Sequence, residues 1–455
     1  MPPTLALFLC LCFIAFLFVI DRRKDSPVTY ASLLPLVWVI FVATRPLSLW
    51  LSFDAPNQNL TPQDYMEGSN PIDRAFMATM IFAAITVLTL RKIDWFRLLR
   101  GNAWLLIYFI YAGFTVLGSD FEDISFKRWL KSVGELMIVL VIATEPEPVE
   151  SFKELMKRWA YVLVPISIVF IKYYPHMGVV YSPWGTLEYA GASYSKNGLG
   201  NLCLVCALFF SWSLISWIRN GEFSRRKKEI LIYVLYLVMI AWLFSKASSA
   251  TSLLCFLVGL SVVLGMQLPI VRQNTRYIGL LYLFLVLSIV SLELLFNLSS
   301  SLLSGVGRDV SLTGRTDLWE NAIRLAPNPI IGAGYESFWI GDRLRTLWSI
   351  YWWQPIQAHN GYIEVYLNMG LLGLLFLFLL LWSTGRNIKE TLIHDYDFGN
   401  LCLALFSGIL FFNITEAAFK PLHLMWNLLL LIFTIGTACA WKARQSAPDA
   451  ESEDV

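Results

Sequence analysis

The chain has 455 residues, of which 57% are hydrophobic, and its mean hydropathy is +0.59. Soluble globular proteins are normally less than half apolar, so this composition excludes that class and predicts a polytopic membrane protein. The formal net charge of +2 indicates no nucleic-acid partner, and the seven cysteines lie mostly in apolar runs, where no disulfide framework is expected. The sequence lacks Walker A, Rossmann and HExxH motifs, which argues against ATP-driven transport and zinc-dependent hydrolysis.

Apolar runs near the length that crosses a membrane recur along the whole chain. A helix needs about 20 apolar residues to cross the hydrocarbon core. Thirteen candidate runs lie near 3–20, 29–51, 75–90, 103–118, 132–144, 159–172, 198–218, 229–245, 251–266, 277–298, 360–383, 399–413 and 425–441. We therefore predict an all-α polytopic membrane protein with about 12–13 transmembrane helices and one large loop carrying short helices. The runs 132–144, 159–172 and 399–413 are short enough to be re-entrant or merely buried.

These runs divide the chain into four parts. We expect transmembrane helices 1–10 over residues 1–298, a large loop over 299–358, the C-terminal transmembrane helices over 359–443 and a disordered tail over 444–455. The tail is acidic and rich in small residues, a composition typical of disorder. The first apolar run has its positive charges after it rather than before it, so we expect a retained span and not a secretory signal.

Positive charges predict the orientation of the chain. If the loop 299–358 lies outside, alternation of the spans places seven short basic segments inside: DRRKDS, RKIDWFRLLR, FKELMKR, RNGEFSRRKK, PIVRQNTR, TGRNIK and WKAR. These segments hold 21 of the 35 Lys and Arg residues. Because short cytoplasmic loops are enriched in Lys and Arg, the loop 299–358 is predicted to face away from the cytoplasm, and the tail is predicted to be cytoplasmic.

Several cations nevertheless fall on the predicted outer side. Arg45 lies within an apolar run next to Pro46, where a charge costs about 3 kcal/mol on insertion scales and usually faces a polar interior. An arginine extending to the interface is the alternative interpretation. The other outer cations are Lys127, Arg128, Lys131, Lys196, Lys246, Arg308, Arg315 and Lys420. Individually they could be interface anchors, but together they predict an electropositive cavity that binds an anionic substrate.

The long loop carries a predicted amphipathic helix. Leu318, Ala322 and Leu325 in TDLWENAIRLA recur at helical spacing, Thr316 is placed to cap the helix, and Arg315 precedes it. Farther along, GAGYESFW contains two glycines that permit a tight turn before Tyr335. The cluster LWSIYWWQP resembles an aromatic belt at a membrane interface, although exposed Trp and Tyr would equally suit sugar stacking.

His359 opens the next apolar run and is the histidine in the most polar setting. Asn360, Glu364 and Asn368 form a polar stripe on the predicted helix, close to the face that carries Tyr362. A polar stripe on a membrane helix must face protein or water and not lipid. We therefore predict that His359 acts at the outer mouth of a polar cavity.

These motifs resemble those of a known superfamily. GRTDLW, PIIGAGYESFW and HNGYIEVYLNMGLLGL resemble the C-terminal signature shared by O-antigen ligases and Wzy-type polysaccharide polymerases. YSKNGLGN is similar to a Lys-Asn-x-Leu-Gly stretch of exopolysaccharide polymerases in that superfamily. The resemblance covers roughly residues 190–440 and implies a GT-C-like fold. Its members are metal-independent membrane glycosyltransferases without a cofactor that act on undecaprenyl-diphosphate-linked glycans at the periplasmic face of the bacterial inner membrane.

The resemblance also assigns roles to residues. It implies that Arg315 and His359 are the essential arginine and histidine, whereas Arg128 matches an earlier outer-loop arginine by topology alone. Further residues expected to bind diphosphate or glycan are Arg45, Lys196, Lys246, Arg308, Tyr335, Asn360, Tyr362 and Glu364. The implied partners are the lipid-linked oligosaccharide, membrane lipids, an acceptor glycan or lipid A core and, for a polymerase, a chain-length regulator.

Three alternatives to a metal-independent polymerase remain open at the level of sequence. Lys196 and Asn197 favour polymerisation of repeat units over ligation of a finished glycan to lipid A core. A cationic cavity would also suit a glycolipid transporter or flippase, although no internal repeat typical of transporters is found. Finally, Asp120, Glu122 and Asp123 in DFED could hold a divalent cation for a metal-dependent enzyme, but they are more simply an acidic outer loop.

Overall fold

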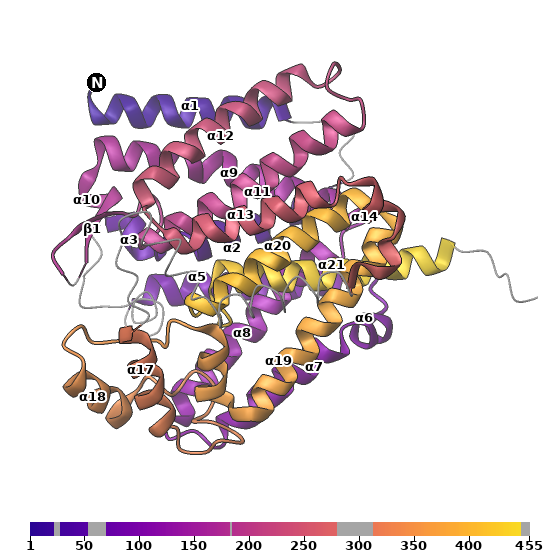
Figure 1. The fold of residues 1–455 in the computed structure, drawn as a ribbon. Coiled ribbons are helices and arrows are strands. Elements are labelled where there is room, and N and C mark those ends of the chain that lie inside the picture. Colours follow the sequence, from indigo (N-terminus) through magenta and orange to yellow (C-terminus); the bar gives the residue numbers. More distant parts are fainter. Residues whose placement is uncertain (22–27, 53–69, 183, 280–312, 447–455) are drawn as a thin grey trace, which may run out of the picture.

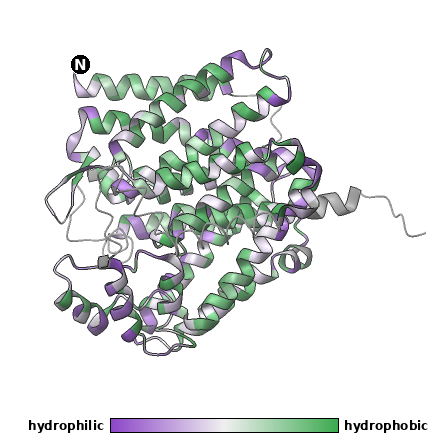
Figure 2. Ribbon diagram, in the orientation of Figure 1, coloured by the Kyte–Doolittle hydropathy of each residue, from purple (hydrophilic) through white to green (hydrophobic). Residues whose placement is uncertain are grey.

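A computed structural model describes residues 1–21, 28–52, 70–182, 184–279 and 313–446. Long helices run alongside one another, and the segment from residue 313 to the start of the last long helices caps one end of the bundle (Figure 1). Hydrophobic residues dominate the long helices, whereas hydrophilic residues gather in this cap and in the loops at the opposite end (Figure 2).

The described helices have the following bounds: α1 (Pro3–Asp21), α2 (Leu33–Ala43), α3 (Leu47–Ser52), α5 (Pro71–Leu90), α6 (Trp95–Gly101), α7 (Ala103–Val116), α8 (Glu122–Ala143), α9 (Pro148–Tyr173), α10 (Pro175–Gly178), α11 (Lys196–Arg219), α12 (Lys227–Ala247), α13 (Ala250–Gly265), α14 (Pro269–Gln273), α17 (Thr313–Arg324), α18 (Gly341–Ile350), α19 (Gly361–His394), α20 (Tyr396–Thr415) and α21 (Leu424–Ser446). Two 3-10 helices are η1 (Tyr30–Ser32) and η3 (Thr275–Tyr277). The strands β1 (Val179–Tyr181) and β2 (Leu187–Tyr189) form an antiparallel hairpin, with Val180 opposite Glu188.

The predicted class, an all-α polytopic membrane protein, is confirmed. Within the described residues, six helices are long and apolar enough to cross a membrane: α1, α5, α11, α12, α19 and α20. Shorter apolar helices cover Tyr30–Ala43, Ala103–Val116, Ala250–Gly265 and Leu424–Cys439. The three short candidate runs are parts of longer helices, because 132–144 lies in α8, 159–172 in α9 and 399–413 in α20. The candidate run 277–298 extends outside the described residues.

The two ends of the bundle carry different side chains. α11 and α20 each span about 30 Å or more, since an α-helix rises 1.5 Å per residue. At one end Asn197 of α11 contacts Glu416, which follows α20. At the other end Arg219 of α11 pairs with Asp397 of α20. Lys157 and Arg226 line a cavity together with Asp397, so described segments that are predicted to lie inside meet at this end, whereas the cap formed by α17 and α18 lies at the other end.

A break in α19 receives the loop that follows α17. At Gly370 the backbone leaves the helical conformation, with φ 66° and ψ −165°. The loop supplies partners for backbone groups that the break leaves without helical hydrogen bonds. The amides of Ala333 and Gly334 donate to the carbonyls of Leu367 and Asn368 at 3.0 and 2.9 Å. In return, the amides of Leu371 and Leu372 donate to the carbonyls of Pro329 and Ile330 at 2.9 and 3.1 Å. These bonds fasten the cap to the membrane helix, because a buried backbone group without a partner is costly.

Glycine is required on both sides of this contact. A Cβ on Gly370 would lie 2.2 Å from the carbonyl oxygen of Ile330, and a Cβ on Gly332 would lie 2.4 Å from the backbone of Asn368. Both residues have positive φ, a conformation that costs other L-residues about 1 kcal/mol or more. The glycines of PIIGAG, which the sequence analysis expects to permit a turn, and Gly370 thus allow a loop backbone to approach a helix backbone.

The cap has a hydrophobic core of its own. Leu318 and Ala322 of α17 are fully buried, together with Phe338 and Leu347, against Leu367 of α19. The predicted amphipathic helix is confirmed, but it begins at Thr313, so that Arg315 lies in its first turn instead of before it.

We expect Gly370→Ala to lower the free energy of unfolding by at least about 2 kcal/mol, because the added Cβ meets backbone atoms and the φ angle is unfavourable. Gly385→Ala is the matched control in the same helix, since a Cβ at Gly385 meets nothing within 4 Å. Thermal melting in one detergent preparation would compare them. Equal melting temperatures for the two variants would contradict the account of the break.

Candidate functional site

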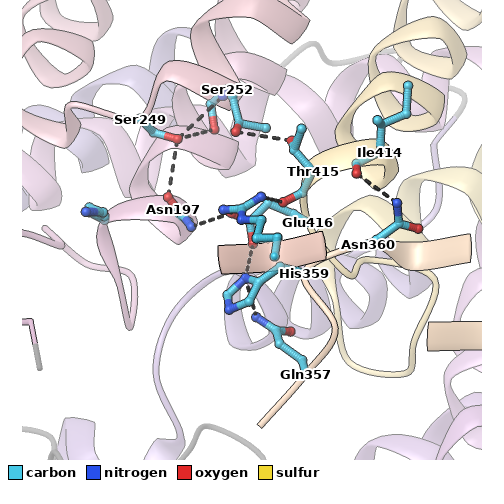
Figure 3. A network of polar contacts seen from close by, with 12 residues as sticks. Asn197, Ser249, Ser252, Gln357, His359, Asn360, Ile414, Thr415 and Glu416 are labelled. Atoms are coloured by element: carbon cyan, nitrogen blue, oxygen red, sulfur yellow. Dashed lines mark hydrogen bonds and ion pairs between the residues drawn. The ribbon is translucent and has the colours of Figure 1, made fainter. Parts of the chain in front are cut away.

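Several helix ends meet around the carboxylate of Glu416. The N-termini of α11, α13 and α19 and the C-terminus of α20 contribute its surroundings, and the labelled side chains Asn197, His359 and Glu416 point toward one another (Figure 3). Helix N-termini carry partial positive charge, so this end of the bundle favours anions. Glu416 itself is only 7% exposed, although His359 beside it is partly accessible.

Capping residues hold the functional side chains at these helix ends. The Ser195 hydroxyl accepts a hydrogen bond from the Gly198 amide and begins α11, which places Asn197 in its first turn. The Asn360 side chain accepts from the amides of Tyr362 and Ile363 and begins α19, which leaves His359 directly before the helix. An N-cap oxygen satisfies amides that otherwise lack partners and fixes where the helix starts.

His359 and Glu416 form the central pair. The imidazole Nδ1 lies 3.2 Å from Oε2 of Glu416. Since an ionised carboxylate only accepts hydrogen bonds, Nδ1 carries the proton of a neutral His359 and Nε2 keeps its lone pair. Among the described residues, no hydrogen-bond partner is found for Nε2. This arrangement prepares Nε2 to accept a proton, and the carboxylate would stabilise the resulting imidazolium.

Arg315 approaches the same carboxylate from the cap. Its Nη1 donates to the carbonyl oxygen of Thr415 at 2.5 Å, and its Nη2 lies 3.8 Å from Oε1 of Glu416. The Arg315 side chain is 30% exposed, so the guanidinium is held in position and remains accessible. A guanidinium with free N–H groups can bind the oxygens of a phosphate.

Two further polar contacts surround the pair. The Asn197 amide donates to Oε1 of Glu416 at 3.0 Å and is itself contacted by the Ser249 hydroxyl at 3.4 Å. Lys420 donates to Oε1 of Gln357 at 2.7 Å, and Nε2 of Gln357 lies 3.5 Å from Nδ1 of His359. Lys196, next to Asn197, pairs with Glu188 of β2 at 2.5 Å. The structure thus brings His359, Arg315 and Lys196 to one region, with Lys420 beside them.

Other predicted site residues make structural contacts. Arg45 is fully buried in the break between α2 and α3, where it donates to the carbonyls of Met177, Gly191 and Ser193. Arg128 of α8 donates to the carbonyl of Glu336 in the cap.

Tyr335, also predicted to bind substrate, lies in the cap. Its hydroxyl lies 2.7 Å from the Ser132 hydroxyl of α8. Burial raises the pKa of the Tyr335 phenol well above its ordinary value, so this hydroxyl stays protonated.

The polar stripe of α19 is turned toward protein, as expected for a membrane helix. Asn360 donates to the carbonyl of Ile414 at 2.9 Å, and the Tyr362 hydroxyl donates to that of Leu410 at 3.2 Å. Glu364 is buried and accepts from the Ala358 amide at 2.8 Å. These contacts join α19 to α20 and to the segment that carries His359.

Lys246 is a further cation that the sequence predicts at the site. The Lys246 ammonium lies over the rings of Tyr189 and Trp242, 5.3 and 5.7 Å from their centroids. Arg308 lies outside the described residues.

The acidic segment DFED does not join the site. Asp120 pairs with Arg343 of α18, which fastens the cap to the start of α8. A cavity of about 520 Å³ lies instead among Asp21, Glu154, Lys157, Tyr233 and Asp397, at the opposite end of the bundle. It contains none of the predicted site residues.

Glu416 is the central residue that the sequence analysis missed. It follows an apolar run in FFNITEAAFK, and a carboxylate at the end of such a run is the signal that could have singled it out. Its partners lie 57, 101 and 219 residues earlier in the chain, at His359, Arg315 and Asn197, so no local motif joins them.

Two comparisons with known proteins bear on the resemblance that the motifs indicated. Residues 230–378, which include Arg315 and His359, match the family described as O-antigen ligase. The exopolysaccharide production protein ExoQ of Rhizobium meliloti (strain 1021) is 24% identical over 376 residues, covering 79% of this chain and 83% of ExoQ. The resemblance indicated by the motifs is thereby confirmed: both comparisons support a similarity to the superfamily of O-antigen ligases and Wzy-like proteins.

The backbone of His359 is strained, with a φ of 50°. We expect His359→Gly to be at least as stable as His359→Ala, by up to about 1 kcal/mol, because both lose the imidazole but only alanine keeps a Cβ at positive φ. Thermal melting of the two purified variants provides the comparison. A clearly more stable alanine variant would show that His359 is not held in the left-handed conformation.

Proposed function

We propose that the protein is a glycosyltransferase of the bacterial inner membrane that acts at the periplasmic face. It transfers glycan from an undecaprenyl-diphosphate-linked donor to a hydroxyl of an acceptor glycan, and it polymerises O-antigen or exopolysaccharide repeat units. The observation that supports this proposal is the meeting of His359, Glu416 and Arg315 from three separate segments at one end of the bundle.

His359 serves as the general base in this reaction. The acceptor oxygen attacks the anomeric carbon of the donor sugar, and its proton passes to Nε2 of His359. The bond between the anomeric carbon and the diphosphate oxygen breaks, and its electron pair leaves with the diphosphate. Attack opposite the leaving group inverts the anomeric centre. A positioned base contributes about 10²–10⁴-fold to such a step.

Arg315 binds and stabilises the diphosphate leaving group. Negative charge grows on the diphosphate as the glycosidic bond breaks, and a guanidinium held in place stabilises that charge without reorganising. The ammonium groups of Lys196, which is next to Asn197, and of Lys420, which donates to Gln357, add positive charge to this region. Fixed cations of this kind perform the task that a divalent metal performs in other enzymes, so the proposed reaction is metal-independent.

Glu416 acts through His359 as a positioning residue. Its carboxylate accepts the Nδ1 proton and thereby presents Nε2 to the substrate, and it stabilises the imidazolium formed on proton transfer. Asn197 donates to the other carboxylate oxygen and keeps Glu416 in this orientation.

The acceptor distinguishes a polymerase from a ligase. Polymerisation is favoured by the similarity to an exopolysaccharide production protein over 79% of the chain. Ligation of a finished glycan to lipid A core is the second candidate, because the matching family is described as O-antigen ligase. Purified protein supplied with donor and both acceptors would show which product forms.

The first test separates the roles of Arg315 and His359. Arg315→Ala should weaken donor binding and slow turnover together, because the diphosphate is charged both before and during the reaction. His359→Ala should keep donor affinity within a few-fold and lower turnover by about 10²–10⁴-fold. Donor binding, steady-state rate and melting temperature are measured in excess EDTA.

The conservative variant Glu416→Gln tests the positioning role of the carboxylate. It should lower turnover less than His359→Ala does, because the amide oxygen can still orient the imidazole but cannot stabilise its positive charge. A folded His359→Ala protein with near-normal turnover would refute the role as base. Loss of wild-type activity in EDTA, restored by magnesium or manganese, would refute metal independence.

The second test concerns orientation. Arg345 in the cap and Arg225 in the loop between α11 and α12 are both exposed, at opposite ends of the bundle. In intact cells, a membrane-impermeant thiol reagent should label Arg345→Cys above the background of the wild type and should leave Arg225→Cys unlabelled until the membrane is opened. The reverse pattern would place the cap in the cytoplasm.

A further inference from the structure

An exposed pair of tryptophans lies on the cap side of the molecule. Trp184 comes from the turn between β1 and β2, and Trp352 follows α18. Their ring centroids are 5.8 Å apart and their planes meet at 86°. The two residues are 63% and 68% exposed, respectively. The rings therefore form an open corner whose faces are accessible.

Contacts join both sides of this corner to the pair of His359 and Glu416. On one side, the ring of Trp353, the neighbour of Trp352, lies 6.3 Å from that of His359. On the other side, Glu188 of the hairpin pairs with Lys196 at 2.5 Å, and the adjacent Asn197 contacts Glu416 at 3.0 Å. The corner is thus built onto the same elements that hold the base and its carboxylate.

The surroundings of Trp184 and Trp352 differ from those of an aromatic pair that faces lipid. The turn that carries Trp184 is polar, since the hydroxyls of Ser182 and Thr186 lie 2.5 Å apart within it. Trp352 is followed closely by the exposed Gln354. By contrast, the exposed pair Phe378 and Trp382 lies in the apolar run of α19, where lipid is the expected neighbour.

We propose that Trp184 and Trp352 form a platform that binds sugar rings of the glycan beyond the reacting bond. The C–H face of a sugar ring packs against the electron-rich face of an aromatic ring, and two rings at right angles offer two such faces. The assignment rests on the proposed function, because it takes the substrate to be a glycan. The platform guides the glycan toward His359, whereas Arg315 binds the diphosphate.

The test uses the full-length protein in detergent and a lipid-free probe. The probe is the repeat-unit oligosaccharide of the source cells, released from its lipid diphosphate by mild acid. Trp184→Ala and Trp352→Ala should each weaken its binding by roughly 3- to 10-fold, the range expected for loss of one aromatic contact. Trp382→Ala is the matched control, because Trp382 is 66% exposed, and it should bind the probe as the wild type does.

Undecaprenyl diphosphate without sugar serves as the second ligand, and its affinity should be equal in all four proteins. Unchanged oligosaccharide affinity in both platform variants would overturn the proposal. An equal loss of affinity for the two ligands would also overturn it, as would a lower melting temperature that accounts for the weaker binding. If the platform variants behave as expected while His359→Ala keeps normal turnover, the platform stands and the base assignment fails. A wild type that binds no oligosaccharide refutes the platform and the glycan-transfer function together.

Discussion

The insertion of the loop 329–334 into the break of α19 is the contact on which the candidate site depends. Four backbone hydrogen bonds replace those that the helix gives up around Gly370. Because the freed groups lie in a membrane helix, where water cannot satisfy them, the loop and the helix stabilise each other. The first turns of α19 then hold His359 at a fixed place, and α17 brings Arg315 toward it. The packing of Leu318 and Ala322 against Leu367 adds to these bonds in keeping Arg315 near the histidine.

The carboxylate of Glu416 brings the polar side chains together. A carboxylate at the end of a membrane helix is costly unless it is hydrogen-bonded, and here Asn197 and His359 supply partners while Arg315 lies at 3.8 Å. The same contacts that offset the cost of burying Glu416 also orient the imidazole and hold the guanidinium close. The groups that stabilise the buried carboxylate are therefore the same groups that Glu416 holds in position.

Four of the cations that the sequence predicts to lie outside divide into two groups in the structure, although the sequence presents them alike. Arg45 and Arg128 donate to backbone carbonyls, and they fasten the break after α2 and the turn of the cap. Arg315 also donates to a carbonyl, that of Thr415, but it and Lys196 keep partly exposed side chains near Glu416 and His359. A cation held by carbonyls inside the protein contributes to packing, whereas a cation that is partly exposed next to a base can meet a substrate.

The sequence by itself determined the class of the protein and most of its helices, and it predicted two residues of the candidate site. Apolar runs and basic loops suffice for this, because the bilayer imposes helix length and helical periodicity acts over neighbouring residues. The motifs likewise pointed to Arg315 and His359. Only the tertiary structure decided that Glu416 joins them, that the polar stripe of α19 binds protein groups, and that Gly370 breaks its helix to receive a loop. These features depend on contacts between segments far apart in the chain, and no local pattern of residues encodes which distant carbonyl or carboxylate a side chain will meet.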